Sequence, residues 1–401
     1  MTSDLSSAGA ATGDGTTAPR RARARGRGAF RRLASFAFGT LLALGAGEVA
    51  VRVIDPLGRV RFESYFEDAD RNRVDYATAL ARGLVVEPGL PRNRGTWTPG
   101  LVFYMCYRDG ARPYMDERGC VRVEINALGL RDRADLTVEK PPGVRRVVCI
   151  GDSFTFGWGV AEPLVWVRLI EAGLRRRTGD ERIATVNCGA AGALYVDEYW
   201  WGLRDRFGRL QPDVVLVSLC LNDIALMPNT IALETPAPRR DQPLYLLRML
   251  DALVRPHDRF ALDPAVDWGQ LLLDLPPDNP AYAAKAETHD MFWGSGGPQA
   301  ALRAMRAWCR EHGAAFGVVV WPLFQNLGRD EHYPFHTLHR VVGEFCATEG
   351  IPVLDLFATF HGQRAEELWV DPSDMHGNEK AHALAAPVIE AFVADLLARP
   401  R

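Results

Sequence analysis

The chain has 401 residues, 47% of them hydrophobic, and a formal net charge of −3. This length is enough for one large domain with additional segments, or for two smaller domains with buried cores. Basic side chains are concentrated in residues 1–32, and the rest of the chain has no stripe of Lys and Arg of the kind that binds nucleic acid. We therefore exclude a nucleic-acid partner.

The first predicted elements are a basic tail and an apolar segment. Residues 1–32 contain few large apolar side chains, so burial cannot offset the entropy of ordering them, and we expect disorder to about Ala29. Residues 33–54 form an apolar run with Glu48 and Arg52 near its far end, where both would have to lie at the membrane interface. A basic flank before such a run is typical of a signal-anchor or an export signal. We predict an uncleaved single-pass transmembrane span, with the N-terminus in the cytoplasm and the following domain outside the membrane.

Residues 55–144 alternate short apolar pieces with Gly, Pro and Arg and show no helical period. We predict an irregular stalk, or accessory segment, with a few strands. Cys106 and Cys120 flank a turn-like stretch in it, on the side of the membrane where disulfides form, and whether they are paired is left open. The seven cysteines of the chain do not show the spacing of metal ligands, and we predict no metal site.

The pattern changes in residues 145–398, where apolar runs of strand length alternate with amphipathic stretches of helix length. Such alternation predicts an α/β fold in which helices cover both faces of a mostly parallel, five-stranded sheet, a three-layer α/β/α sandwich. The predicted strands are 147–150, 183–188, 214–219, 316–321 and 352–356. The predicted helices are 165–175, 198–207, 299–311, 337–349 and 380–398.

A Pro-rich insertion, residues 225–296, interrupts this alternation between the third and fourth strands. It contains one apolar helix candidate, residues 244–254. Long insertions in compact domains tend to be functional or disordered, so we interpret this one as a lid over the site, with an unstructured excursion as the alternative.

The first candidate site residue is Ser153, in the sequence Gly151-Asp152-Ser153 directly after the first strand of the sheet. In an open parallel sheet, ligands bind at the carboxyl ends of the strands, so the hydroxyl of Ser153 is expected to face that crevice. The alternative is a helix N-cap Ser, which is common at strand-to-helix turns. The turn is not the nucleophile elbow of α/β-hydrolases, because Thr155 stands where that motif needs its second Gly.

Two further candidates follow the next two strands. Gly192 and Asn222 could supply a backbone N–H and a side-chain amide to the negative oxygen that forms when an ester is attacked. Taken singly, they would be interpreted as a turn Gly and a capping Asn.

The candidate base is His376, which precedes the last predicted helix. A Ser nucleophile at neutral pH needs an adjacent base, usually His, and a carboxylate that holds the tautomer of its ring. Asp371 and Asp374 stand shortly before His376. We interpret His382, six residues later, as a helix-surface residue.

These four blocks, in this order and at strand ends, resemble the SGNH (GDSL-type) hydrolase family over about residues 126–396. The resemblance implies a flavodoxin-like three-layer sandwich with Ser153 as nucleophile and His376 as base. It also implies an oxyanion hole made by the N–H groups of Ser153 and Gly192 and by the amide of Asn222.

The sequence departs from the family pattern in two blocks. Cys220 replaces the first Gly of Gly-x-Asn-Asp, and Ser373 stands where Asp-x-x-His requires Asp. Asp374 instead forms Asp-x-His, a spacing that resembles the alginate O-acetyltransferase branch of the same superfamily. We predict that Asp374 completes the triad, with Asp371 as the alternative.

The predicted activity is that of a serine esterase, or lipase-like hydrolase, acting on a small-molecule or glycan-linked ester through an acyl-Ser153 intermediate. This chemistry requires no metal and no organic cofactor. The same residues would serve an O-acyltransferase that acts on envelope glycan. A third alternative is a non-catalytic glycan-binding or scaffolding module that retains the fold.

Overall fold

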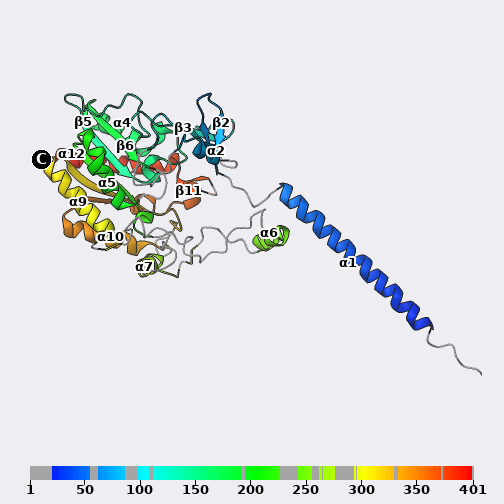
Figure 1. Ribbon diagram of the computed structural model, residues 1–401. Coiled ribbons are helices and arrows are strands. Elements are labelled where there is room, and N and C mark those ends of the chain that lie inside the picture. The colour runs from blue at the N-terminus through cyan, green and yellow to red at the C-terminus, as the bar shows by residue number, and fades with distance from the viewer. Residues whose placement is uncertain are drawn as a thin grey trace, which may run out of the picture. The chain divides into compact units, whose positions relative to one another are not determined.

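A computed structural model of the chain describes residues 20–54, 62–85, 97–107, 112–190, 195–225, 243–254, 262–263, 265–275, 293–294, 296–328, 333–371 and 374–399. The chain divides into two compact units. The helical unit comprises Met1–Arg59 and Pro236–Pro256, and the sheet unit comprises Val60–Thr235 and His257–Arg401. Figure 1 shows the elements of both units in chain order.

The helical unit contains the long helix α1 (Arg20–Ile54), drawn in blue in Figure 1. Its segment Phe30–Ile54 is long and apolar enough to cross a membrane. Part of the basic tail that we expected to be disordered is helical, because α1 begins at Arg20. Arg and Ala, which dominate this stretch, are good helix formers, and adding residues to an existing helix costs far less than starting one.

The helix α6 (Tyr245–Val254) belongs to the same unit and contacts α1. It confirms the helix predicted within the insertion. Most of residues 225–296 lie outside the described residues, so the lid stays a prediction. A second helix of the insertion, α7 (Trp268–Leu273), lies in the sheet unit, where the N–H of Gly269 donates to the carbonyl of Pro334.

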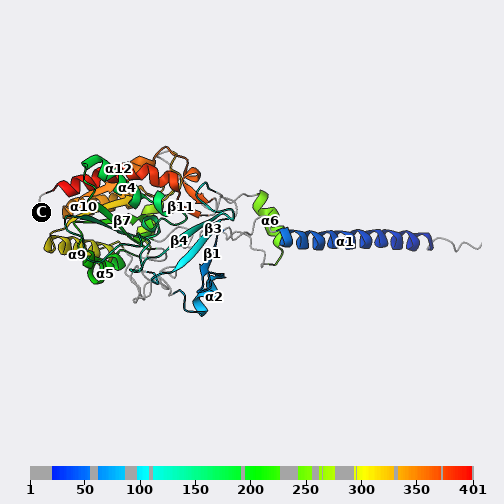
Figure 2. The same cartoon turned by 90° about the horizontal axis from the view of Figure 1, so that it is seen from above.

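The central sheet of the sheet unit has five parallel strands in the order β6-β5-β7-β8-β9. Helices α4 and α12 pack together on one face, and α5 and α9 on the other (Figure 2). This confirms the α/β three-layer architecture and every predicted strand and helix of residues 145–398. The bounds are β5 (Arg145–Gly151), α3 (Ser153–Phe156), α4 (Trp166–Thr178), β6 (Ile183–Gly189), α5 (Val196–Asp205), β7 (Val214–Cys220), α9 (Gly297–Glu311), β8 (Ala315–Trp321), α10 (His336–Glu349), β9 (Val353–Asp355), α11 (Phe357–Phe360), β10 (Trp369–Asp371), β11 (Asp374–Gly377) and α12 (Glu379–Ala398), with 3-10 turns at Glu162–Leu164, Phe207–Leu210, Leu221–Asp223 and Ala365–Glu367.

Residues 55–144, predicted to be an irregular stalk or accessory segment with a few strands, contain a second, antiparallel sheet. Its strands, in the order β2-β1-β3-β4, are β1 (Phe62–Glu67), β2 (Arg73–Asp75), β3 (Val102–Tyr107) and β4 (Cys120–Glu124), and α2 (Tyr76–Ala81) follows β2. Its buried side chains join the same hydrophobic core as the parallel sheet. The ring of Trp97, for example, lies 5.7 Å from that of Phe156 in α3. A few strands were predicted here, but not their bounds or their pairing, because they are short and separated by Gly, Pro and Arg, which are typical of loops.

The two cysteines of this second sheet form a disulfide. Cys106 on β3 and Cys120 on β4 are directly opposite each other in the antiparallel register and are bonded. The bond crosslinks β3 and β4. The sequence had left open whether these two cysteines are paired.

Candidate active site

Ser153 is the first residue of α3, at the carboxyl end of the central strand β5. The chain goes from β5 to β6 on one side and then to β7 on the other, so Ser153 stands where the strand order reverses. Crevices at such switch points are the usual ligand sites of open α/β sheets. The N-cap of α3 is Asp152, whose carboxylate accepts the N–H of Phe154 at 2.9 Å, so the interpretation of Ser153 as the helix cap is wrong.

Two glycines allow α3 to lie tightly against the sheet. A Cβ atom on Gly151 would lie 2.2 Å from Oγ1 of Thr155 and 2.4 Å from the carbonyl oxygen of Ser218. A Cβ atom on Gly189, at the end of β6, would lie 2.2 Å from the backbone nitrogen of Phe156. Any side chain at these positions would push α3, and with it Ser153, away from the edge of the sheet.

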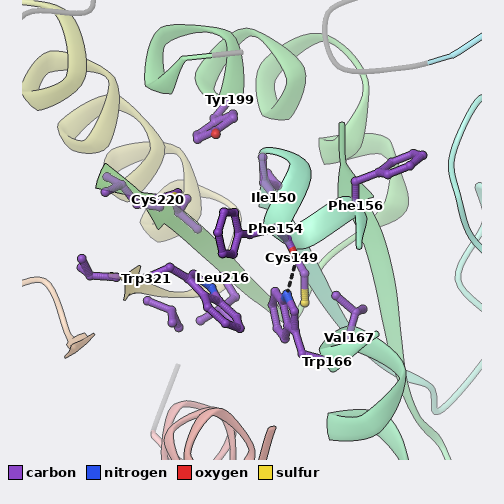
Figure 3. Packing of buried hydrophobic residues seen from close by; sticks show 14 of the residues in the cluster. Cys149, Ile150, Phe154, Phe156, Trp166, Val167, Tyr199, Leu216, Cys220 and Trp321 are labelled. Carbon is purple, nitrogen blue, oxygen red and sulfur yellow. Dashed lines mark hydrogen bonds between the residues drawn. The ribbon is translucent and has the colours of Figure 1, made fainter. Parts of the chain in front are cut away.

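Aromatic residues beneath α3 hold it in place (Figure 3). The ring of Phe154 lies 5.6 Å from that of Trp321 on β8, and the Nε1–H of Trp166 donates to the carbonyl of Phe154 at 3.1 Å. These side chains are buried in the core. The backbone of Phe154, next to Ser153, is thus fixed at its N–H by the Asp152 cap and at its carbonyl by Trp166.

The structure brings Ser153, His376 and Asp374 into contact. Oγ of Ser153 lies 2.8 Å from Nε2 of His376, and Nδ1 of His376 lies 2.5 Å from Oδ1 of Asp374. Asp371, the alternative acid, is buried on β10, and its backbone pairs with that of Asp374 across the β10–β11 hairpin. The carboxylate at the His376 ring is therefore that of Asp374.

The charges of this pair stabilise each other. Burial raises the pKa of Asp374, but the charge of His376 and hydrogen bonds from His376 and Tyr107 outweigh it and lower the pKa to about 2. Burial lowers the pKa of His376, but the charge and hydrogen bond of Asp374, and the charge of Asp152, outweigh it and raise the pKa above 6.5. Asp374 therefore stays ionised, and its charge favours the protonated form of His376.

A second acidic group lies next to Ser153. Oδ2 of Asp152 is 3.3 Å from Oγ of Ser153, and burial raises the pKa of Asp152 to about 6. Burial and the charge of Asp152 also raise the pKa of Asp223 well above its usual value. One oxygen of Asp223 accepts the N–H of Cys220 at 2.8 Å, so this carboxyl group supports the turn after β7.

Of the two predicted oxyanion residues outside the triad, one is described. Asn222 lies in the turn Leu221–Asp223 directly after β7, the strand next to β5. Its Oδ1 is buried and has no hydrogen-bond partner among the described residues. Gly192 lies outside the described residues. The oxyanion role of both residues stays a prediction.

His382 corrects another interpretation, because it is buried rather than on the helix surface. Its Nδ1 accepts the backbone N–H of Trp166 at 3.1 Å, which joins α12 to α4. Burial, and to a lesser extent the charge of Arg131, lower the pKa of His382 to about 3, so its ring is neutral in the folded protein. Its ring also lies 6.0 Å from that of Trp321 on β8.

Sequence reasoning missed two residues that contact the hairpin carrying Asp374 and His376. The hydroxyl of Tyr107, at the end of β3, donates to Oδ2 of Asp374 at 2.7 Å. Arg112 donates from Nη2 to the carbonyl of Trp369 at 2.5 Å and from Nε to that of Val370 at 3.0 Å. Tyr107 and Asp374 are 267 positions apart, so no motif spacing could have revealed the contact.

The chain is similar to known proteins. Residues 149–384, more than half of the chain, match the GDSL-like Lipase/Acylhydrolase family. Among solved structures, the lipase Lip_vut3 from a goat rumen metagenome is 14% identical, with a TM-score of 0.38 and coverage of 62% of this chain and 97% of that one. A catalytic mutant of Axe2, an acetylxylan esterase from Geobacillus stearothermophilus, is 15% identical, with a TM-score of 0.38 and coverage of 66% and 100%.

No curated protein matches the chain. The family match alone carries the assignment, and it includes the end of β5, Ser153, His376 and the first part of α12. The chain belongs to the GDSL-like lipase/acylhydrolase family and is a hydrolase that acts on ester bonds.

Proposed function

We propose that the protein is a membrane-tethered serine esterase that cleaves carboxylic esters through an acyl-Ser153 intermediate. The observation that carries this proposal is the hydrogen-bonded series from Oγ of Ser153 through the His376 ring to the carboxylate of Asp374. A nucleophile, a base and a group that orients the base are the three parts that such catalysis requires.

In the first step, Nε2 of His376 accepts the hydroxyl proton as Oγ of Ser153 attacks the ester carbonyl carbon. The C=O electrons move to the oxygen, which accepts hydrogen bonds from the N–H groups of Ser153 and Gly192 and from the Asn222 amide. The intermediate collapses, the alcohol leaves with the proton from His376, and the acyl group stays on Ser153. Water then attacks the acyl-enzyme by the same route, which releases the acid.

Asp374 holds His376 in the tautomer that this mechanism needs. With Nδ1–H donating to Asp374, the lone pair of Nε2 faces Ser153. The low pKa of Asp374 keeps its carboxylate charged throughout the working pH range, so it stabilises the imidazolium that forms in each step.

Covalent labelling tests the nucleophile directly. We expect a fluorophosphonate probe to label the wild type and not Ser153→Ala, and hydrolysis of p-nitrophenyl acetate to be lost in the same variant. Ser64→Ala, on strand β1, serves as the matched control and should keep both signals. Equal labelling of the Ser153 variant and the wild type contradicts the proposal. A folded wild type without labelling or hydrolysis would favour the non-catalytic alternative.

An O-acyltransferase acting on envelope glycan is the second candidate. The contact of the His376 ring with Asp374, and not with a residue three positions before it, supports this candidate, because Asp-x-His resembles the acetyltransferase branch. Product analysis separates the two functions. An esterase releases free acid regardless of added glycan, whereas a transferase places the acyl group on a polysaccharide acceptor in preference to water.

The proposal also includes a membrane tether. It is supported by the apolar stretch Phe30–Ile54 of α1 and by the Arg-rich residues before it. We expect the full-length protein to stay in carbonate-washed membranes, with the sheet unit outside the cytoplasm. Release of the full-length protein by the wash would contradict the tether without affecting the esterase assignment.

A further inference from the structure

The carboxylate of Asp374 has two oxygens, and each has its own donor. Oδ1 contacts Nδ1 and the backbone N–H of His376, and Oδ2 accepts the hydroxyl of Tyr107 at 2.7 Å. Tyr107 is only 1% exposed. Because burial and the charge of Asp374 raise its pKa, this phenol keeps its proton and remains a donor.

We infer that Tyr107 is a positioning residue that fixes the rotation of the Asp374 carboxylate and thereby the orientation of His376. This inference rests on the proposed function. A carboxylate with a donor at one oxygen only can turn about its Cβ–Cγ bond, and the His376 ring would turn with it. A second donor from a rigid element prevents this rotation, as partners outside the reacting groups do in other catalytic sites.

The element that carries Tyr107 is rigid and is attached to the hairpin at a second point. Tyr107 ends β3, next to the Cys106–Cys120 disulfide. Arg112 donates to the carbonyls of Trp369 and Val370 on β10 and to the carboxylate of Glu379. Tyr107 and Arg112 therefore both hold the β10–β11 hairpin, although these two residues lie outside the family match.

Tyr107→Phe tests this inference, with Tyr104→Phe as the matched control. Tyr104 is on the same strand, and its hydroxyl donates to Glu67 within the antiparallel sheet, away from Asp374. We expect Tyr107→Phe to lower kcat about 10- to 100-fold with KM little changed, the range typical of residues that orient a catalytic ligand. We also expect the loss of activity at low pH to move to higher pH. Without the hydrogen bond from Tyr107, Asp374 would interact more strongly with His376 and raise its pKa further.

A merely structural role would reduce the amount of folded protein without moving the pH profile. The kinetics are therefore normalised to the folded fraction from near-UV circular dichroism, and the fluorophosphonate labelling rate is measured on the same samples. If Tyr107→Phe matches Tyr104→Phe in kcat, labelling rate and pH profile, the inference is wrong. If the proposed function itself is wrong, ester hydrolysis survives in Ser153→Ala, which is a different result.

A separate observation concerns the helical unit. Glu48 lies within the apolar stretch of α1, where a lone carboxylate would be costly in a bilayer. Its oxygens accept the backbone N–H groups of Tyr245 and Leu246 at 2.9 and 2.7 Å, and its side chain also pairs with Arg52. The N-terminus of α6 is thus bound to this carboxylate, with the polarity that a helix dipole favours.

Two described side chains of α6 are apolar and exposed. Leu247 and Leu250, spaced by three residues, are 50% and 45% exposed, while Tyr245 and Met249 are buried, and Leu244, directly before the helix, is 63% exposed. Residues at this spacing share one side of a helix. The apolar side chains of α1, such as Leu41, are likewise exposed. The two helices are in contact, and each exposes apolar side chains.

We propose that the lipid bilayer covers these side chains, so that α6 is a second membrane contact bound to the end of the span. The argument rests on the proposed membrane tether and on the contact of α6 with α1, which includes the hydrogen bonds to Glu48. An amphipathic helix at the interface buries its apolar face at the level of the headgroups. The Pro-rich insertion would then contact the membrane through α6, rather than serve only as a lid.

Depth-dependent fluorescence quenching tests this proposal on the full-length protein in phosphatidylcholine vesicles. An environment-sensitive fluorophore is placed on a single introduced Cys at Leu247, at Leu41 in α1, or at the exposed Leu80 in the sheet unit as control; the native free cysteines that the structure describes are buried. With nitroxide-labelled lipids, we expect quenching at 247 and 41 and none at 80. Quenching at 41 alone overturns the α6 contact and leaves the tether intact, whereas no quenching at 41 overturns both.

Discussion

His376 and Asp374 are two residues apart on β11, and the ring Nδ1 of one lies 2.5 Å from the carboxylate of the other. In a strand, residues i and i+2 point to the same side, whereas residues i and i+3 point to opposite sides. A carboxylate two positions earlier is therefore the one that extended backbone directs toward the ring. This geometry explains why Asp-x-His takes the place of Asp-x-x-His in this chain.

The first prediction separates the two acids. We expect Asp374→Asn to lower kcat by about 10⁴-fold, because an amide would favour the wrong tautomer of His376. Asp371→Asn should cost far less activity per folded molecule. Both variants are compared by p-nitrophenyl acetate hydrolysis and by melting temperature, because Asp371 is buried and its replacement also affects stability. A larger loss of kcat in Asp371→Asn would assign the triad to the other acid.

The second prediction concerns pH. His376 must be neutral to act as a base, and its pKa is raised above 6.5, with the charge of Asp374 outweighing the effect of burial. The kcat/KM profile should therefore lose activity as pH falls through a midpoint above 6.5. In Asp374→Asn, the residual activity should have its midpoint at lower pH. An unchanged midpoint would show that a group other than His376 causes the loss of activity at low pH.

The third prediction concerns acid stability. His382 has a pKa of about 3 when folded and about 6.5 when unfolded, so below pH 6.5 the unfolded chain binds a proton that the folded chain does not. The free energy of unfolding should fall as pH decreases from 6.5 to 3, by up to about 4 kcal/mol from this group. His382→Asn, which can still accept the N–H of Trp166, should lose that component. Urea melts of both proteins at several pH values measure the difference.

The fourth prediction concerns the disulfide. Replacing both Cys106 and Cys120 by Ala opens a loop with a sequence separation of 14, and it should destabilise the sheet unit by about 3 kcal/mol. Melting temperature should fall by several degrees. Dithiothreitol should lower the melting temperature of the wild type by a similar amount and leave that of the double variant unchanged. If dithiothreitol lowers the melting temperature of both proteins, a different disulfide is responsible.

The fifth prediction concerns the oxyanion. Asn222→Ala should lower kcat by about 10²- to 10³-fold with little change in KM, because the amide contact strengthens only as charge develops on the carbonyl oxygen. Steady-state kinetics with a short ester test it. A higher KM with kcat unchanged would indicate that Asn222 binds the substrate and does not stabilise the transition state.

The parts of the fold that could be predicted are those with a local pattern. Strands such as Val214–Cys220 are continuous buried apolar runs, and α9 and α10 follow the helical period, so both could be read directly from the sequence. The antiparallel sheet could not, because strands such as Arg73–Asp75 are too short to show a period and are stabilised by their partners. His382 was misjudged for a related reason. The face of α12 that is buried depends on what packs against it.

By itself, the sequence determined which segments build the parallel sheet. It also determined that Ser153 and Asn222 follow strands and that His376 precedes the last helix. These features depend on neighbouring residues. Only the tertiary structure decided that Asp374 meets the ring of His376, that Cys106 pairs with Cys120 and that Tyr107 reaches the same carboxylate. The Tyr107–Asp374 and Trp166–His382 hydrogen bonds join residues 267 and 216 positions apart. Contacts over such separations are set by how the layers stack, and they leave no spacing in the chain.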